Sequence, residues 1–261
     1  MRLLWLADVL RDAGLAVVET AGWQLRGRDG MRPRIVIGHH TATGPSTPNA
    51  TVVALLIRGR PDLPGPLCHL GLDRQGRYHI IAAGKANHAG LGVWKDADES
   101  VETIGIEAFN YGNSIPFPTR EPWPQVQLDA YDNGVAALLG HISRDALHFC
   151  GHREWATPPG RKPDPSGIDL DAMRARISAI MEPMTITQAR IEVATEWRKV
   201  AGVWMTPTVN ETAQQRLTRL AAETLTPGGR TAAQIATHAV RISPVPIELS
   251  VPAWVLDPTV P

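Results

Sequence analysis

Three stretches of the sequence place metal-binding side chains next to elements that could hold them. His39 and His40 follow an apolar run that reads as a buried strand, and His152 follows a second short apolar run. Asp164 lies twelve residues beyond His152, in a loop that contains glycine and proline. A catalytic zinc site takes three protein ligands from nitrogen, sulfur or carboxylate oxygen and leaves one position for water. Two of these histidines and the aspartate would complete such a set.

Spacing alone does not decide between a metal site and ordinary structural histidines. Nine histidines are scattered through the chain, and a histidine beside a strand is more often a hydrogen-bonded structural residue. Because 113 residues separate His39 from His152, only a fold can bring them together. Whether His39 and His152 lie close together therefore depends on the strands and helices that carry them.

The apolar patterns predict one α/β domain over residues 1–182, in which strands and helices alternate and mix. Short apolar runs predict strands at 16–19, 35–38, 68–72, 77–82, 103–108 and 147–150. Apolar residues at helical spacing predict helices at 3–15, 52–58, 126–142 and 168–181. Asn49 is expected to cap the second helix. The turn Asp73-Arg74-Gln75-Gly76 predicts that the strands on either side of it form a hairpin.

A boundary is expected near Glu182, and residues 183–261 are expected to form a small helical region. Three helical patterns, at 186–200, 210–224 and 231–240, precede a proline-rich tail that should be extended or irregular.

Composition excludes several classes of function. The 26 basic and 26 acidic side chains balance, so we expect neither nucleic acid nor anionic lipid as a partner. The two cysteines, Cys68 and Cys150, are too few for a disulfide framework, and buried thiols are the simpler interpretation. Asp8 and Arg11 interrupt the first apolar run, so we expect no signal peptide. We also expect no segment to enter a membrane, because no apolar stretch is long enough.

Six short segments occur in the order typical of one enzyme family. They are Ile35 to Ala42, Cys68 to Leu72, Asn87-His88-Ala89-Gly90, Ile104-Gly105-Ile106-Glu107, Gly151 to Glu154 and Gly160 to Asp164. In this order they resemble the zinc-dependent N-acetylmuramoyl-L-alanine amidases, which include amidase-type phage lysozymes and peptidoglycan recognition proteins. The resemblance covers about residues 33–180. It implies a central mixed β-sheet flanked by helices.

The resemblance also implies a role for each of five residues. His39 rather than His40 would be the first Zn²⁺ ligand, His152 the second and Asp164 the third. Glu107 would be the catalytic carboxylate. Lys162 would be the cation that stabilises the oxyanion.

Further positions are less closely matched. His88 is expected to line the cleft and contact the sugar or the peptide, with a structural role as the alternative. His69 is grouped with it as a substrate-binding residue and is expected to hydrogen-bond near the metal, with the same alternative. Cys68 stands where many relatives have tyrosine, so the tyrosine's role cannot be transferred to it. Two extra residues around 157–159 lengthen the loop before Asp164, which makes this ligand depend most on how the loop folds.

The function implied by the resemblance is hydrolysis of the amide bond between N-acetylmuramic acid and L-alanine in peptidoglycan. We expect a phage endolysin that is made in the host cytoplasm and acts on the wall after the membrane is permeabilised. Residues 183–261 would then be a cell-wall-binding module.

The alternatives are a cytosolic amidase that recycles muropeptides and a protein that binds peptidoglycan without cutting it. A helical metalloprotease is disfavoured, because no two histidines lie four apart around a glutamate. The sequence does not indicate the oligomeric state.

Overall fold

The computed structural model describes residues 1–112 and 121–182, which include every residue of the candidate site. The expected helical region at 183–261, and the domain division that it implies, lie outside the described residues and stay predictions. In chain order the elements are α1 (Leu6–Asp12), β1 (Val17–Glu19), η1 (Trp23–Leu25), β2 (Ile35–His40), α2 (Asn49–Arg58), β3 (Gly59–Arg60), β4 (Leu63–Pro64), β5 (Leu70–Leu72), β6 (Tyr78–Ile80), η2 (Ser100–Glu102), β7 (Thr103–Ala108), α3 (Gln125–His141), η3 (Ala146–His148), β8 (Phe149–Gly151), α4 (His152–Trp155) and α5 (Leu170–Met181).

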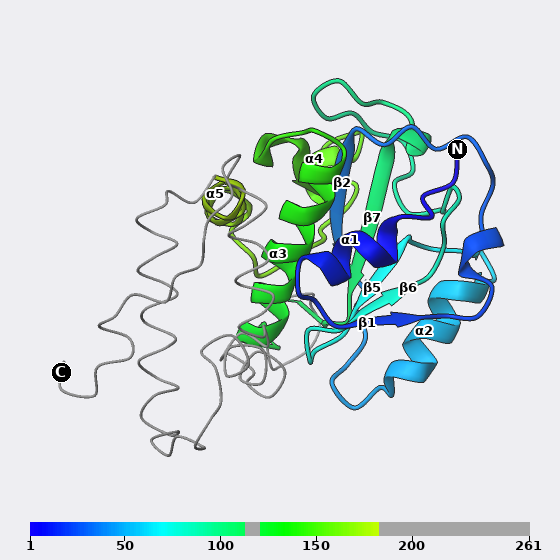
Figure 1. The fold of residues 1–261 in the computed structure, drawn as a ribbon. Coiled ribbons are helices and arrows are strands. Elements are labelled where there is room, and N and C mark those ends of the chain that lie inside the picture. The colour runs from blue at the N-terminus through cyan, green and yellow to red at the C-terminus, as the bar shows by residue number, and fades with distance from the viewer. Residues whose placement is uncertain (113–120, 183–261) are drawn as a thin grey trace, which may run out of the picture. The chain divides into compact units, whose positions relative to one another are not determined.

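Six strands form one mixed sheet in the order β1-β6-β5-β7-β2-β8. β5, β7, β2 and β8 run parallel to one another, and β6 is antiparallel to β5. The expected mixed sheet flanked by helices is therefore confirmed (Figure 1). The hairpin of β5 and β6 around the turn at Gly76 is confirmed as well.

The two faces of the sheet are covered differently. α3 lies between α1 and α5, and these three helices bury one face of the sheet (Figure 1). Val36, Ile104 and Ile106 point to this side and pack with Tyr131 of α3. The opposite face is covered by α2 and α4 and by the loop that follows β6. Strands alternate their side chains between the faces, so each position in β2 and β7 belongs to one side only.

The bounds of several elements differ from the sequence prediction by one to three residues; the helix predicted at 3–15, for example, is Leu6–Asp12. Two differences concern the end of β2 and the start of α2. β2 runs on through His40, because its pairing with β7 continues to the His40–Ala108 position. Asn49 is the first residue of α2 rather than its cap. Its side-chain amide donates instead to Asp73, 3.0 Å away in the hairpin turn.

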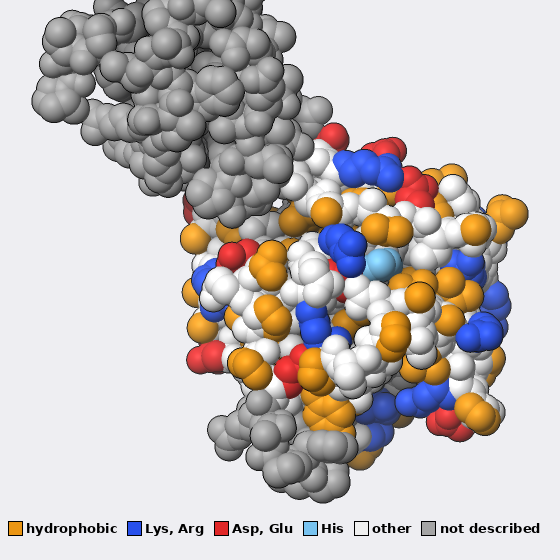
Figure 2. Space-filling model, turned by 90° about the horizontal axis from the view of Figure 1, so that it is seen from below, with side chains coloured by type: hydrophobic (Ala, Val, Ile, Leu, Met, Phe, Trp, Pro, Cys, Tyr) orange, Lys and Arg blue, Asp and Glu red, His pale blue; other side chains and the backbone are white. Residues whose placement is uncertain are grey.

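The described surface carries mixed charge. On the face shown in Figure 2, basic and acidic side chains are interspersed with hydrophobic ones. Many of the surface arginines are paired; Arg34, for example, lies 3.1 Å from Asp96. None of the helices in the part of the chain that the structure describes has both the length and the apolar composition needed to cross a bilayer.

Candidate metal centre

The two candidate imidazole ligands lie at the carboxyl ends of neighbouring parallel strands. His39 is in β2, and His152 directly follows β8, in which Gly151 pairs with Gly38. Parallel strands that are neighbours end at the same edge of the sheet, where α/β proteins commonly place their sites. The ring centroids of His39 and His152 are 4.5 Å apart as a result. The fold thus joins two residues that the sequence separates widely.

Strand alternation separates His39 from its neighbour His40. His39 shares a face with Ile35 and Ile37, away from the helices α1, α3 and α5. His40 points to the other face, where its Nδ1 accepts a hydrogen bond from the backbone N–H of Ser166 at 3.2 Å. The geometry therefore agrees with the choice of His39 as the ligand, and it gives His40 a supporting position.

The long loop after α4 brings Asp164 to the two histidines. The backbone N–H of Arg153 in α4 donates to the backbone carbonyl of Asp164 at 2.7 Å. The Arg153 guanidinium also donates to the carbonyls of Pro165 and Ile168. These contacts anchor the end of the loop to α4, so the two extra residues are absorbed without displacing the aspartate.

Three possible ligand atoms converge at this point. Nδ1 of His39 and Nδ1 of His152 lie 3.0 and 3.1 Å from the same oxygen, Oδ2 of Asp164. The three side chains form the only group of His, Cys, Asp and Glu within residues 1–112 and 121–182 whose ligand atoms all lie within 4.8 Å of one another. Two imidazole nitrogens and one carboxylate oxygen are a donor set that zinc accepts.

The protonation of these groups suits a metal. Burial lowers the pKa of His39 to about 4, although Asp164 opposes this shift. Burial by itself would raise the pKa of Asp164, but its contacts with His152 and His39 hold the pKa below its ordinary value. At neutral pH the site therefore combines a neutral imidazole at His39 with an ionised carboxylate, which are the ligand forms that bind zinc.

The contact made by Nε2 of His152 shows which nitrogen of the ring carries a hydrogen. Nε2 is 3.1 Å from the backbone carbonyl of Ala89, which can only accept. Nε2 therefore carries the hydrogen, and the lone pair of Nδ1 in the neutral ring faces the Asp164 carboxylate. A cation bound between Nδ1 and this carboxylate would be held by both atoms. The residues present thus fit a zinc ion, held by His39, His152 and Asp164.

Glu107 lies next to these ligands. It pairs with His39 in the register of β7 and β2, so both side chains leave the same face of the sheet. Its Oε2 is buried and has no hydrogen-bond partner among the described residues. Burial raises the pKa of Glu107 well above its ordinary value, and the charge of Asp164 adds to the increase. Lys162 opposes it, because its charge lowers the pKa of Glu107 and also that of His39.

The two histidines expected to contact substrate are buried instead. His69 has no exposed surface, and His88 is 7% exposed. Nδ1 of His88 lies 3.1 Å from Nε2 of His39, and the ring of His69 lies behind His88, with centroids 5.2 Å apart. The physical reason is that Gly105 has no side chain, so the ring of His88 can lie against β7. Burial favours the structural alternative for both residues, and contact with substrate stays an untested prediction.

Neither cysteine belongs to the candidate ligand group. Cys68 and Cys150 are both buried free thiols. Burial raises the pKa of Cys68 and of Cys150 well above the ordinary value. Neutral buried thiols are poor nucleophiles and poor ligands.

Sequence reasoning missed Tyr131, which lies beneath the ligand strand. The hydroxyl of this α3 residue lies 3.2 Å from the carbonyl of His39 and 3.3 Å from that of Ile106, to which it donates. A Cβ atom on Gly38 would lie 2.7 Å from the hydroxyl oxygen. Tyr131 thereby ties β2 to β7 under the site. Helical spacing over residues 126–142 predicted only the helix in which it lies.

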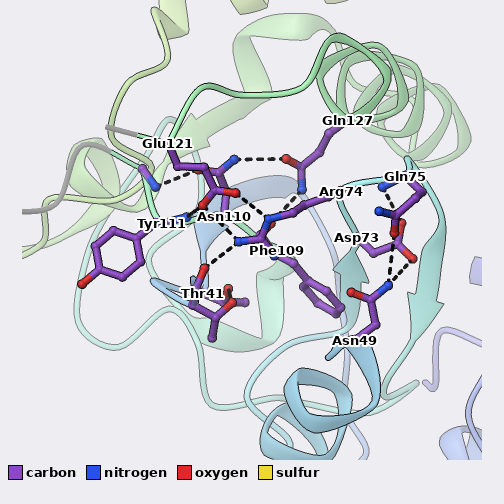
Figure 3. A network of polar contacts seen from close by, with 12 residues as sticks. Thr41, Asn49, Asp73, Arg74, Gln75, Phe109, Asn110, Tyr111, Glu121 and Gln127 are labelled. Carbon is purple, nitrogen blue, oxygen red and sulfur yellow. Dashed lines mark hydrogen bonds and ion pairs between the residues drawn. The ribbon is translucent and has the colours of Figure 1, made fainter. Parts of the chain in front are cut away.

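A half-buried polar network supports the loops that follow β2 and β7 (Figure 3). Arg74, in the hairpin turn, donates to Glu121 at 3.0 Å and to the carbonyl of Thr43 at 2.6 Å. Glu121 in turn accepts from the backbone N–H of Tyr111 at 2.6 Å. Each of these loops directly follows a strand that carries a site residue. The network therefore holds one side of the site in place.

A comparison with models of known protein families finds a match to this chain. The family model described as N-acetylmuramoyl-L-alanine amidase matches residues 29–167. These residues include all three candidate ligands, Glu107 and Lys162. A search of curated proteins finds no match.

Solved structures with some similarity are distant in sequence. The chain is 16% identical to an endolysin N-acetylmuramoyl-L-alanine amidase from Clostridium intestinale, with 62% of this chain and 94% of that chain covered and a TM-score of 0.45. It is 16% identical to the N-acetylmuramyl-L-alanine amidase AmiD from E. coli, solved with anhydro-N-acetylmuramic acid-L-Ala-D-γ-Glu-L-Lys, with 87% and 97% covered and a TM-score of 0.46. For AmpDh3 from Pseudomonas aeruginosa the identity is 17%, the coverage 87% and 99%, and the TM-score 0.45.

Proposed function

The chain belongs to the N-acetylmuramoyl-L-alanine amidase family, and on this premise we propose that it hydrolyses the amide bond between N-acetylmuramic acid and L-alanine of peptidoglycan with the help of zinc. Zinc dependence is a property of the family. The observation that carries the proposal for this chain is the meeting of Nδ1 of His39, Nδ1 of His152 and Oδ2 of Asp164.

The reaction must overcome a poor electrophile and a poor nucleophile, since an amide resists attack and neutral water attacks weakly. Zinc, when bound, lowers the pKa of a bound water and polarises the scissile carbonyl. The role of the three ligand side chains is to hold the ion at the edge of the sheet. Asp164 is the least buried of them, with 14% of its side chain exposed, compared with 2% for His39 and 5% for His152. We therefore place the approach of substrate on the aspartate side.

Glu107 transfers the proton in this proposal. Its carboxylate takes a proton from the attacking water as the new C–O bond forms at the carbonyl carbon. It then gives that proton to the amide nitrogen as the C–N bond breaks. The products are a lactyl carboxylate on the sugar and a free amino group on L-alanine. A carboxyl whose pKa is raised above its ordinary value holds a transferred proton more firmly than an ordinary carboxylate does, which suits it to carry the proton from the water to the amide nitrogen.

Lys162 stabilises the negative charge that develops on the carbonyl oxygen. Support for this role comes from its half-buried position and from its influence on the pKa of both Glu107 and His39. A fixed positive charge in a partly buried site stabilises an oxyanion more strongly than the same charge in water. In this proposal Glu107 transfers the proton, and Lys162 stabilises the negative charge on the carbonyl oxygen.

Within this activity we favour a phage endolysin that reaches the wall once the membrane has been permeabilised. The family match ends at residue 167, and a further region follows the α/β unit. We propose that residues 183–261 bind cell wall. Truncation of the chain after Glu182 should reduce the fraction that pellets with purified sacculi; unchanged pelleting would contradict this role.

The substrate form is tested by offering two substrates to the zinc-loaded protein. An endolysin should clear a suspension of intact sacculi at a protein concentration at which soluble muropeptides are cut slowly. A recycling amidase would show the reverse preference. A protein that bound sacculi but released no peptide from either substrate would contradict the enzymatic proposal and favour the non-catalytic alternative.

A further inference from the structure

The dipeptide His88–Ala89 touches both imidazole ligands from the side away from Asp164. The ring of His88 meets Nε2 of His39 at 3.1 Å. The carbonyl of Ala89 meets Nε2 of His152, also at 3.1 Å. Each ligand histidine therefore has one nitrogen toward Asp164 and the other toward this dipeptide.

A series of hydrogen bonds behind His39 has a fixed direction. Its last acceptor is the backbone carbonyl of Ser100, which can only accept, so the hydroxyl of Thr103 donates to it at 3.0 Å. The Thr103 oxygen then accepts from Nε2 of His88, 3.2 Å away. With its hydrogen on Nε2, the neutral ring of His88 has a lone pair on Nδ1, and this atom accepts from Nε2 of His39.

The consequence is that the lone pair of Nδ1 of His39 faces Asp164. The same result holds at His152, whose Nε2 donates to the carbonyl of Ala89. That carbonyl is itself held by the indole N–H of Trp155, which donates to it at 3.0 Å. Two independent sets of contacts, both ending in backbone carbonyls, thus point two lone pairs at one carboxylate oxygen.

The position of His88 is fixed by packing as well as by hydrogen bonds. The ring lies against Gly105 of β7, where a Cβ atom would come within 2.5 Å of its Nδ1. The ring of His69 also packs against it, at an interplanar angle of 81°. His69 is itself held by the backbone N–H of Gly105, which donates to its Nδ1 at 3.0 Å. This confined, 7% exposed ring has little freedom to rotate away from His39.

We propose that His88 is a positioning residue that sets the tautomer and the ring orientation of His39, and that the Ala89 carbonyl does the same for His152. The inference rests on the proposed function insofar as the site holds zinc. Contacts behind the ligands that orient the metal-binding ring commonly change metal affinity 10- to 100-fold when they are removed. His88 thus acts on zinc through His39 and does not touch substrate.

The tautomer is tested directly by NMR of the imidazole nitrogens in the ¹⁵N-labelled, zinc-loaded full chain. We expect His88 to carry its hydrogen on Nε2, with Nδ1 unprotonated, and His39 likewise to carry its hydrogen on Nε2. A His88 ring with the hydrogen on Nδ1 would overturn the proposal, because it could not accept from His39.

Zinc affinity, measured by competition with a chromophoric chelator, provides the second test. His88→Leu removes the acceptor and should weaken zinc binding about 10- to 100-fold. His88→Asn places an amide oxygen near the position of Nδ1 and should restore most of the affinity. Thr103→Val, which removes the next acceptor, should weaken binding in the same direction, and the double variant should bind no more weakly than His88→Leu alone.

His79→Leu is the matched control. His79 is as buried as His88, at 8% exposed, and hydrogen-bonds to Asp73 rather than to a ligand. It should lose thermal stability in the metal-free protein while its zinc affinity stays within about twofold of the wild type. Equal zinc affinity of wild type and His88→Leu, or an equal loss in His79→Leu, would overturn the inference. Tight zinc binding without cleavage of peptidoglycan would instead contradict only the proposed function.

Discussion

The ring of His88 occupies the space that a side chain on Gly105 would need. A Cβ atom on Gly105 would lie 2.5 Å from Nδ1 of the histidine ring, closer than real Cβ contacts come. The glycine in the Ile104-Gly105-Ile106-Glu107 segment is thus explained by the histidine in the Asn87-His88-Ala89-Gly90 segment. Two sequence motifs that are separated along the chain form one packed unit behind His39.

Gly105→Ala is therefore expected to displace His88. Overpacking of a buried site should cost about 1–3 kcal/mol of the free energy of unfolding, and zinc affinity should fall with it. Gly140→Ala is the control, since a Cβ atom there meets nothing within 4 Å, and alanine at this exposed helix position should stabilise the protein slightly. Urea unfolding of the metal-free protein measures the free energy of unfolding of both variants. A Gly105→Ala variant as stable as the wild type would show that His88 is not confined as described.

Removal of any one ligand should abolish stable zinc retention. His39→Ala, His152→Ala and Asp164→Ala each leave two of three protein ligands, so we expect less than one tenth of a zinc ion per chain after dialysis. His148→Ala, at a half-buried histidine paired with Asp145 at 2.7 Å, should retain zinc as the wild type does. Metal analysis of the dialysed proteins measures the result. Full zinc content in the Asp164→Ala variant would exclude the aspartate from the ligand set.

Glu107→Gln should keep zinc but lose turnover, because the amide has the shape of the carboxyl group but cannot accept the proton. We expect a fall in kcat of at least about 100-fold with little change in zinc content. Rates on soluble muropeptide together with metal analysis separate the two effects. Wild-type turnover in this variant would remove Glu107 from the mechanism.

The same substitution should change how the stability of the metal-free protein depends on pH. Burial raises the pKa of Glu107 above its ordinary value of 4.5, so the folded chain keeps a proton that the unfolded chain releases. The wild type should therefore lose stability as pH rises from about 4.5 through the raised pKa of the folded state, and Glu107→Gln should not show this loss. Melting temperatures from pH 4.5 to 8 should diverge in favour of the variant. Parallel curves would contradict the raised pKa.

The polar network around Arg74 should stabilise the folded protein more than an exposed ion pair does. Arg74→Leu removes the guanidinium that donates to the half-buried carboxylate of Glu121 and to the carbonyl of Thr43, at a cost of about 2 kcal/mol. Arg32→Ala breaks a pair with Glu99 whose side chains are both 61% exposed, so it should change stability by less than about 0.5 kcal/mol. Equal effects in urea unfolding would show that the network is not specially stabilising.

The sequence predicted the strands of the site well because their signals are local. Thr103–Ala108 appears as expected, and apolar runs marked β2 and β8 to within two residues or so. The pairing of β2 with both β7 and β8 is not local, since it joins residues more than sixty positions apart. Apolar runs carry no information about partner or direction. The meeting of His39 with His152 therefore came from the family resemblance and not from the pattern.

The roles of His69 and His88 were the part that sequence could not decide. Both residues are polar, and polar residues beside a predicted site suggest contact with substrate. What buries them is the absence of a side chain at Gly105, together with hydrogen bonds to Thr103 and to the Gly105 backbone. Such contacts depend on the register of β7 against neighbouring segments, which only the folded chain provides.

The most direct test of the central claim is mass spectrometry of peptidoglycan digested by the zinc-loaded full chain, with Glu107→Gln as the control. We predict peptides with a new free amino-terminal alanine and glycan chains that stay intact, from the wild type only. New reducing sugar ends, peptides cut within the stem, or the same products from Glu107→Gln would contradict it.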